Sequence, residues 1–238
     1  MRRLIDHFVD PADHLAVDEA MLLECDQGHL RDSFRLWEFE DPTVVIGRAS
    51  KIDVEVDREH CRTHGIPVLR RCTGGAAVVG GPGCLMYSVV LGFERHPGIE
   101  RIDVAHQFVM ERVLSAVQRQ VPEALFQGTC DLTWNDKKFS GNSLRIGRRS
   151  LLYHGTILYD GDLDRIAGCL KVPPRQPTYR AGRDHRAFIT NIQVDVVELR
   201  RHLAESFEVE DESTALPHTR IGELRRDRYA NPAWHDRH

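Results

Sequence analysis

Strand-like and helical segments follow one another in this chain without the regular alternation that a doubly wound fold requires. Residues 105–117 carry apolar side chains at the 3.6-residue spacing of a helix, and residues 85–91 form an apolar run typical of a buried strand. Asp10-Pro11 predicts a helix start, and Gly28 predicts its end. The further predictions are strands at 34–39 and 44–46 joined as a hairpin through Asp41-Pro42, a helix at 54–64, a strand at 68–71, a hairpin of 131–134 with 138–139 around Asn135-Asp136, a strand at 151–159, a short helix after Asp162, and a last helix at 196–207. This order favours an α+β fold with a mixed or antiparallel sheet.

The composition is that of an ordinary globular protein, with 238 residues, 41% hydrophobic and 29% charged. We expect residues 1–238 to form a single domain. A net charge of −4 argues against broad electrostatic binding of nucleic acid. No apolar stretch approaches the ~20 residues of a membrane helix, and the N-terminus has no apolar segment of a secretory signal. The six scattered cysteines are typical of reduced thiols, so we expect a cytoplasmic protein with no membrane partner.

A glycine-rich segment spans residues 70–83, and five of its residues from 74 to 83 are glycine. Glycines let a backbone approach a ligand closely and turn N–H groups toward an anion. Arg70 and Arg71, just before them, could clamp a carboxylate or phosphate. The alternative is a tight turn between two strands with solvated arginines. The segment is not a P-loop, because no Gly-Lys-Ser/Thr follows, and it enters a strand-like run rather than the helix of a dinucleotide site.

Only four of the 32 basic residues are lysines, and two of these are adjacent, Lys137 and Lys138. Neighbouring residues of a strand point to opposite faces, so one lysine can face a site while the other faces water. Phe139 then shares the outer face with Lys137, and Gly141 permits close approach to the backbone. The alternative is a polar hairpin tip.

His154 stands beside Gly155 in a predicted strand, where a lone histidine is usually structural. No Gly-x-Ser-x-Gly motif supports a serine hydrolase, and no pair of ligand motifs has the spacing of a zinc site. A functional role for His154 therefore depends on which other residues the fold places beside it.

Taken together, these segments resemble the lipoate–protein ligase and octanoyltransferase family, in the family's order and spacing and over nearly the whole chain. The motifs that carry the resemblance are Arg70-Arg71-x-x-Gly74-Gly75, Gly83-x-Leu85-x-Tyr87-Ser88, Asp131-Leu132, Lys138-Phe139-Ser140-Gly141 and His154-Gly155-Thr156, with Asp18-Glu19, Val44 to Arg48 and Tyr229 to Trp234 as further similarity.

The resemblance implies the fold of biotin protein ligases and class II synthetases, a mixed sheet flanked by helices. It implies that ATP and Mg²⁺ convert lipoate or octanoate to an acyl-adenylate, which acylates a lysine on a lipoyl domain of a 2-oxoacid dehydrogenase complex or on the glycine-cleavage H protein. Lys138 would contact the acyl carbonyl and phosphate, and Asp131 would lie near the nucleotide and Mg²⁺. The implied substrate-binding residues are Arg70, Arg71, Thr73, Gly74, Gly75, Ala76, Gly83, Gly141, His154, Gly155 and Thr156.

Two departures from the family pattern bear on the reaction. Ligases commonly carry a third glycine and then His-Asp, where this chain has Ala76 and Gly80-Gly81. Octanoyltransferases pass the acyl group through a cysteine, but one known cysteine position holds Leu151 and the other falls near Pro122-Glu123. Cys130 remains as a candidate nucleophile, although the adjacent carboxylate would raise the pKa of its thiol.

We therefore predict an ATP-dependent lipoate–protein ligase. Many ligases carry an extra C-terminal domain that we do not find in this sequence. We expect one of three explanations: a separate accessory subunit supplies it, the protein is a ligase that works without it, or the protein is a transferase. The alternatives are a cysteine-dependent octanoyl- or lipoyltransferase and a non-catalytic acyl-binding module. A biotin ligase is disfavoured because its Gly-Arg-Gly-Arg-x-Gly loop is missing.

Residues 173–187 combine three prolines with four arginines, Arg175, Arg180, Arg183 and Arg186. This composition predicts a mobile lid whose arginines approach phosphate.

Overall fold

The computed structural model describes residues 1–237 and contains an eight-stranded sheet and a three-stranded sheet. The strands are β1 (Arg2–Leu4), β2 (Ser33–Trp37), β3 (Thr43–Ile46), β4 (Val68–Arg70), β5 (Val78–Gly80), β6 (Cys84–Gly92), β7 (Leu125–Gln127), β8 (Asp131–Trp134), β9 (Lys137–Ile146), β10 (Ser150–Leu158) and β11 (Asp211–Ser213). The helices are α1 (Pro11–Asp26), α2 (Ile52–Glu55), α3 (Arg58–Thr63), α4 (Ile102–Gln118), α5 (Leu163–Cys169), α6 (His185–Phe188), α7 (Val196–Ser206), α8 (His218–Leu224) and α9 (Pro232–His235), with a 3₁₀ turn η1 (Thr178–Arg180) and a π-helical turn η2 (Arg225–Tyr229).

The large sheet has the order β11-β1-β2-β6-β10-β9-β8-β7, and the small sheet has the order β4-β3-β5. β1 pairs in parallel with β2 and β11, while the other neighbours in the large sheet are antiparallel. The prediction of an α+β fold with a mixed sheet is confirmed.

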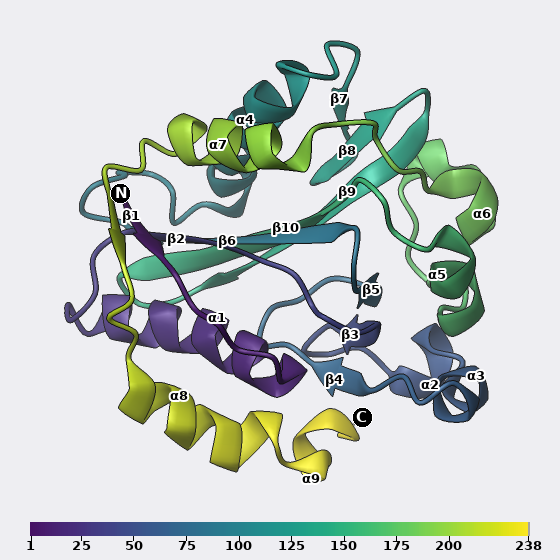
Figure 1. The fold of residues 1–238 in the computed structure, drawn as a ribbon, viewed down its shortest axis with the longest axis horizontal. Helices are drawn as coiled ribbons and strands as arrows, with labels where there is room; N and C mark the ends of the chain where they lie inside the picture. Colours follow the sequence, from purple (N-terminus) through teal and green to yellow (C-terminus); the bar gives the residue numbers. More distant parts are fainter. Residues whose placement is uncertain (238) are drawn as a thin grey trace.

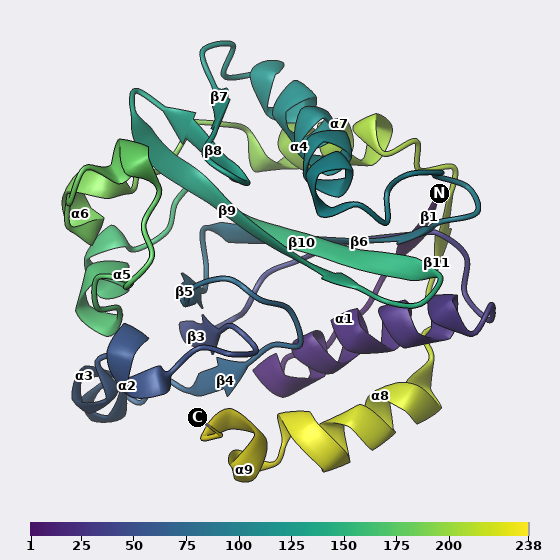
Figure 2. The ribbon, with the colours of Figure 1, turned by 180° about the vertical axis from the view of Figure 1, so that it is seen from behind.

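The large sheet separates two apolar cores (Figures 1 and 2). Helices α4 and α7 cover one face, and α1 with the small sheet covers the other. Alternate residues of β6 supply the two cores: Tyr87 and Val89 pack on the α4 side, and Met86 and Val90 pack on the α1 side. This alternation follows from the pleat of a strand. Because both faces are covered, β6 is buried along nearly its whole length.

Two local predictions are confirmed by their backbone chemistry. The Asp10 side chain accepts a hydrogen bond from the N–H of Ala12 and caps α1, with Pro11 in the first turn. The β8–β9 hairpin turns at Asn135 and Asp136, which have φ of 49° and 57°. These left-handed conformations are those of the two-residue turns that match the twist of paired strands.

Four local predictions are wrong. β2 and β3 do not form a hairpin, because β2 pairs within the large sheet and β3 within the small one. The helix expected at 54–64 is two helices, since Val56 is extended and bridges to Leu170, and Asp57 caps α3. The helix predicted at 196–207 is not the last one, because α7 is followed by α8, η2 and α9. Finally, Phe139 was expected on the outer face of its strand with Lys137, but it is fully buried in the α4-side core. Lys137, at the hairpin tip, is exposed.

Candidate active site

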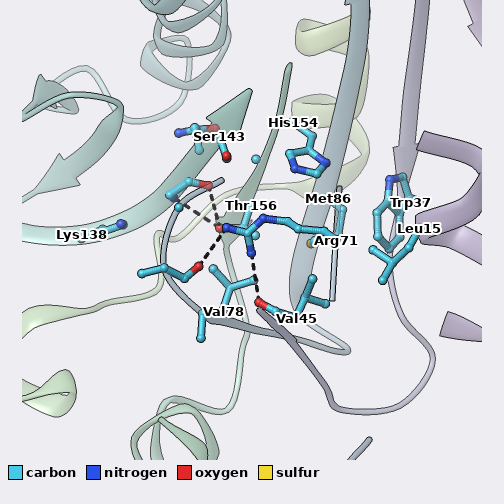
Figure 3. Close-up of a pocket in the computed structure, with 16 residues that line it drawn as sticks. Leu15, Trp37, Val45, Arg71, Val78, Met86, Lys138, Ser143, His154 and Thr156 are labelled. Carbon is cyan, nitrogen blue, oxygen red and sulfur yellow. Dashed lines mark hydrogen bonds between the residues drawn. The ribbon is translucent and has the colours of Figure 1, made fainter. Parts of the chain in front are cut away.

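Two cavities adjoin between the glycine-rich loop and strands β9 and β10. Figure 3 shows the residues that line the first of them. Both are lined by Ala76, Ala77, Val78, Lys138, Gly141 and Thr156. The first cavity extends to apolar residues of α1, β2, β3 and β6, which are Leu15, Trp37, Val45 and Met86, and to Arg71, Gly75 and His154. The second cavity extends to α5, α6 and the 173–187 segment, and Arg175, Arg180 and His185 are among its lining residues. Ala76, Gly141 and Thr156 thus lie where the cavities meet.

Arg71 lines the first cavity, but its guanidinium shapes the loop. Nη1 donates to the carbonyl of Val45 at 3.0 Å, Nη2 donates to the carbonyls of Ala76, at 2.9 Å, and Gly74, and Nε donates to the hydroxyl of Thr73 at 2.9 Å. Burial lowers the pKa of Arg71 to about 10. The five donors of a guanidinium suit this binding of several carbonyls at once. The side chain therefore holds the loop curled beside the cavity (Figure 3).

Gly75 makes this curled loop possible. Its φ of +82° lies in the left-handed region, and a Cβ there would lie 2.9 Å from Nη2 of Arg71. A side chain at this position would be strained and would also crowd the arginine. Gly74 contributes its carbonyl, which accepts from Arg71 and from the Ser143 hydroxyl, at 2.9 Å in the second case.

Arg70 is not brought to either cavity. Its side chain is fully buried, and its guanidinium donates to the carbonyls of Gly47 at 2.9 Å, Ser50 at 2.8 Å and His235 at 2.9 Å, and to those of Arg48, Trp234 and Arg237. The clamp predicted for the two arginines is therefore absent from this structure, because both guanidinium groups are occupied by backbone carbonyls. Gly83 also lies outside the two cavities, in the bend before β6.

Lys138 lies at the second position of β9 and lines both cavities. Its Nζ forms an ion pair with Oδ1 of Asp131 at 2.6 Å, and its side chain is 28% exposed. A Cβ at Gly141 would lie 2.8 Å from Nζ, so the lysine crosses the strand where that glycine leaves room. Tyr179 donates to Oδ2 of Asp131 at 2.8 Å, which ties the 173–187 segment to this pair. Asp131 itself lies beside the cavities rather than in their lining.

His154 connects the first cavity to a buried carboxylate. Its Nδ1 lies 2.8 Å from Oδ2 of Asp18, and its Nε2 lies 2.7 Å from the Thr73 hydroxyl. Burial alone would raise the pKa of Asp18, but hydrogen bonds from His154 and Ser88 and the charge of Arg35 hold it below its usual value. Because Nε of Arg71 donates to the Thr73 oxygen, the Thr73 hydrogen is free to donate to Nε2. His154 thus links the Thr73 hydroxyl of the loop to the buried carboxylate of Asp18.

Gly155 and Thr156 place the neighbouring strand against β9. The amide oxygen of Asn142 occupies the space that a Cβ at Gly155 would need, and it accepts from the Tyr87 hydroxyl. The Thr156 hydroxyl accepts from the N–H of Gly141 at 3.3 Å. These contacts set the spacing between the strands that carry His154 and Lys138.

Cys130 is poorly suited to be a nucleophile. Burial and the adjacent Asp131 raise the pKa of its thiol to about 11, despite the opposing charges of Lys138 and Arg71. The Sγ donates to the carbonyl of Asn142 at 3.0 Å, and Cys130 lines neither cavity. At neutral pH the thiol is therefore almost entirely protonated, and the thiolate is the reactive form.

Several residues of this site escape sequence reasoning. Leu15, Trp37 and Met86 line the first cavity from three separate elements, and Tyr179 contacts Asp131 across 48 positions of sequence. No local motif marks them, because apolar residues in α1, β2 and β6 are expected in any core.

Residues 1–237 contain no cluster of three or more His, Cys, Asp and Glu side chains that could hold a metal ion. Within the same range, none of the helices is both long enough and apolar enough to cross a membrane.

Comparisons with known proteins agree on one family. The sequence model of the lipoyl protein ligase A/B catalytic domain matches residues 10–216. The chain is 25% identical to lipoate–protein ligase 1 of Staphylococcus aureus over 94% of this chain and 64% of that protein, so it spans about two thirds of that relative. It is 27% identical to the octanoyltransferase LipM of Clostridioides difficile over 83% of each. Its fold is similar to that of the bi-partite lipoate protein ligase from Thermoplasma acidophilum, studied with its E2 lipoyl domain, with a TM-score of 0.81, 23% identity and coverage of 99% of this chain and 95% of that one.

Proposed function

Because the chain belongs to the lipoyl protein ligase A/B catalytic domain family, we propose that it attaches lipoate or octanoate to a lysine of a lipoyl domain through an acyl-adenylate made from ATP. The observation that carries this proposal is the position of Lys138, which lines both adjoining cavities. Both cavities have largely apolar linings, and each also carries cations: Arg71 and Lys138 in the first, and Lys138, Arg175 and Arg180 in the second. An acyl chain beside its activating phosphate fits two such adjoining spaces.

The first cavity suits the acyl chain. Leu15, Trp37, Val45 and Met86 supply apolar walls, and burying each methylene group of an octanoyl or lipoyl chain contributes ~0.8 kcal/mol. His154 and Gly75 are polar groups of the same lining. The carboxyl end of the chain would then lie toward the residues shared by the two cavities, Lys138 among them.

Lys138 would act on charge that develops during both half-reactions. In the first, an oxygen of the acyl carboxylate attacks the α-phosphorus of ATP and pyrophosphate leaves. In the second, the amine of the acceptor lysine attacks the acyl carbon, AMP leaves and the amine loses a proton. Negative charge on phosphate oxygens is stabilised by an ammonium already held in place. The compact ammonium of lysine fits beside Gly141, where the broader guanidinium fork of arginine would be crowded.

Asp131 is the residue that would hold Mg²⁺. It supplies a single carboxylate next to Lys138, and Mg²⁺ bound with nucleotides commonly uses one or two carboxylates together with phosphate oxygens. Bound there, the ion would neutralise phosphate charge. The chain's own part is to offer the carboxylate, which Lys138 and Tyr179 already orient.

A two-donor assay tests the proposal. The protein is incubated with an apo lipoyl domain and either lipoate with ATP and Mg²⁺ or octanoyl carrier protein alone, and the mass of the acceptor is measured. We expect the lipoyl mass increase only in the first mixture. Modification only from the carrier protein would replace the proposal by the transferase. Binding of lipoate without modification in either mixture, and with no transfer from preformed lipoyl-AMP, would favour a non-catalytic acyl-binding module.

The cysteine-dependent transferase is the second candidate, supported by the similarity to an octanoyltransferase. The environment of Cys130 argues against it, so we expect Cys130→Ser to retain acylation activity within about twofold of wild type, because the buried thiol is almost entirely protonated. The measurement is the initial rate of acceptor modification from each donor. A loss of about 100-fold or more, with an unchanged melting temperature, would restore Cys130 as the nucleophile.

We also propose that residues 1–238 act as one catalytic domain and that an accessory subunit assists the adenylation step. The match to residues 10–216 and the similarity to a bi-partite ligase support this proposal. The glycine-cleavage H protein is a second proposed acceptor.

The mobile lid at residues 173–187 stays a prediction. The segment lines the second cavity through Pro173, Arg175, Pro177, Arg180 and His185. We expect limited trypsin digestion to cut at Arg175, which is exposed, and saturating lipoate with ATP to suppress that cut because the closed segment is held against ligand. Cleavage at the exposed Arg62 of α3 serves as the internal control. Equal cutting at Arg175 with and without ligand would contradict the lid.

A further inference from the structure

Glu55 is a buried carboxylate that contacts the glycine-rich loop although it lines neither cavity. It is the last residue of α2, is 8% exposed, and its Oε2 accepts a hydrogen bond from the N–H of Ala77 at 2.7 Å. Ala77 lines both cavities. Among residues 1–237, no nitrogen of a lysine, arginine or histidine side chain lies within 4.0 Å of the Glu55 carboxylate. The side chain is thus held by a backbone group of the loop rather than by a cation.

The loop is also held by other residues, but through its carbonyl groups. Two of these contacts come, like that of Glu55, from residues that line neither cavity: the Arg48 N–H donates to Thr73 at 2.7 Å, and the Ser50 hydroxyl donates to Gly75 at 3.3 Å. Arg71, which lines the first cavity, donates to the carbonyls of Gly74 and Ala76. Of these contacts, only that of Glu55 provides an acceptor. The others are donors, so none of them can replace it.

The backbone of Glu55 is fixed to the other wall of the second cavity. Its carbonyl accepts from the N–H of Lys171 at 2.9 Å, and the next residue, Val56, forms a β-bridge with Leu170. Leu170 belongs to the lining of the second cavity. Glu55 therefore contacts the loop through its side chain and the end of α5 through its backbone. The position of Ala77 relative to that end of α5 thus depends in part on this one residue.

We propose that Glu55 is a positioning residue that holds Ala76 and Ala77 where the two cavities meet, and so sets the affinity of the first cavity for the acyl substrate. This inference rests on the proposed function, which places the carboxyl end of lipoate or octanoate beside these residues. A carboxylate binds a backbone N–H more strongly than a neutral acceptor does. Because a partly buried N–H needs an acceptor, loss of the carboxylate should let the loop move until Ala77 is hydrated.

The test is calorimetric titration of the full chain with lipoate, without ATP. This measures the acyl cavity whether the enzyme is a ligase or a transferase. Glu55→Ala should weaken lipoate binding by about 10-fold, and Glu55→Asp by a similar factor, because the shorter side chain withdraws the acceptor. Glu55→Gln should regain most of the affinity, to within about threefold of wild type, since its amide oxygen reaches the same N–H. The Asp and Gln variants decide the matter even if the Ala variant does not fold.

Asp53→Ala is the matched control, because it removes an exposed carboxylate of the same helix that pairs with Arg58. We expect it to bind lipoate as wild type does. Melting temperatures, followed by circular dichroism, separate stability from affinity: a Glu55→Asp variant that melts earlier but binds lipoate normally would make Glu55 a structural residue only.

Two other results would overturn the role of Glu55. Tighter binding by the Ala and Asp variants would mean that the carboxylate competes with the ligand for the Ala77 N–H. A loss in Glu55→Gln but not in Glu55→Asp would assign the effect to charge, since the charge of Glu55 opposes the lowering of the Arg71 pKa by burial. If wild type bound no lipoate, the proposed function would fail together with this role, whereas equal binding by wild type and all variants would refute the role alone.

Discussion

Replacing Lys138 by alanine should lower the rate of acyl-adenylate formation by about 100- to 1,000-fold while leaving the fold intact. This is the effect expected when a preorganised charged donor is removed from developing negative charge, ~3–4 kcal/mol of barrier. The side chain is 28% exposed at the start of β9, so its removal opens no core cavity. The measurement is lipoate-dependent exchange of pyrophosphate into ATP, together with transfer from preformed lipoyl-AMP.

Lys137→Ala is the matched control for this prediction. Lys137 is the adjacent lysine of β9, is exposed, and lies on the other face of the strand. We expect its rates to equal those of wild type. If the Lys138 and Lys137 variants were equally active, the ammonium at the junction of the cavities would have no part in the chemistry. Lys138→Arg should also be impaired, since Gly141 leaves room for a narrow side chain.

Replacing Arg70 by alanine should destabilise the protein by about 3–5 kcal/mol. The buried guanidinium binds carbonyls of residues 47–50 and of the C-terminal segment 234–237, so its loss leaves several buried acceptors unsatisfied and opens a cavity. A loss of stability this large is at the upper end of what single substitutions cause. The measurement is urea unfolding followed by circular dichroism, with the midpoint converted at constant slope.

Arg62→Ala provides the comparison for Arg70. Arg62 is 74% exposed and pairs with Glu59 on the surface of α3, where such pairs contribute little. We expect the free energy of unfolding of this variant to match that of wild type. A loss below about 1 kcal/mol for Arg70→Ala would show that water or neighbouring donors replace the guanidinium. Arg70→Lys should rescue little, because one ammonium cannot bind two separate groups of carbonyls.

The two arginines show where sequence reasoning reaches its limit. The adjacent Arg70-Arg71 before a run of glycines predicts an anion clamp, and the local sequence contains nothing against it. The carbonyls that occupy Arg70 come partly from residues 234–237, more than 160 positions away. Whether a guanidinium faces a ligand or a carbonyl is decided by which distant backbone packs beside it. The erroneous hairpin of β2 and β3 has the same cause, since partners in two different sheets override a plausible turn.

The sequence by itself determined those features of the protein that depend only on residues close to one another in the chain. The turn at Asn135-Asp136 starts β9, and the alternation of a strand then separates Lys137 from Lys138. The amphipathic stripe of residues 105–117 likewise predicts α4, because a helix that long needs one buried face. Tertiary structure alone decided that Lys138 joins two cavities and that Nη2 of Arg180 is buried without a hydrogen-bond partner among residues 1–237. Both facts depend on the packing of elements far apart in the chain, and burial and unmet hydrogen bonds exist only once that packing is complete.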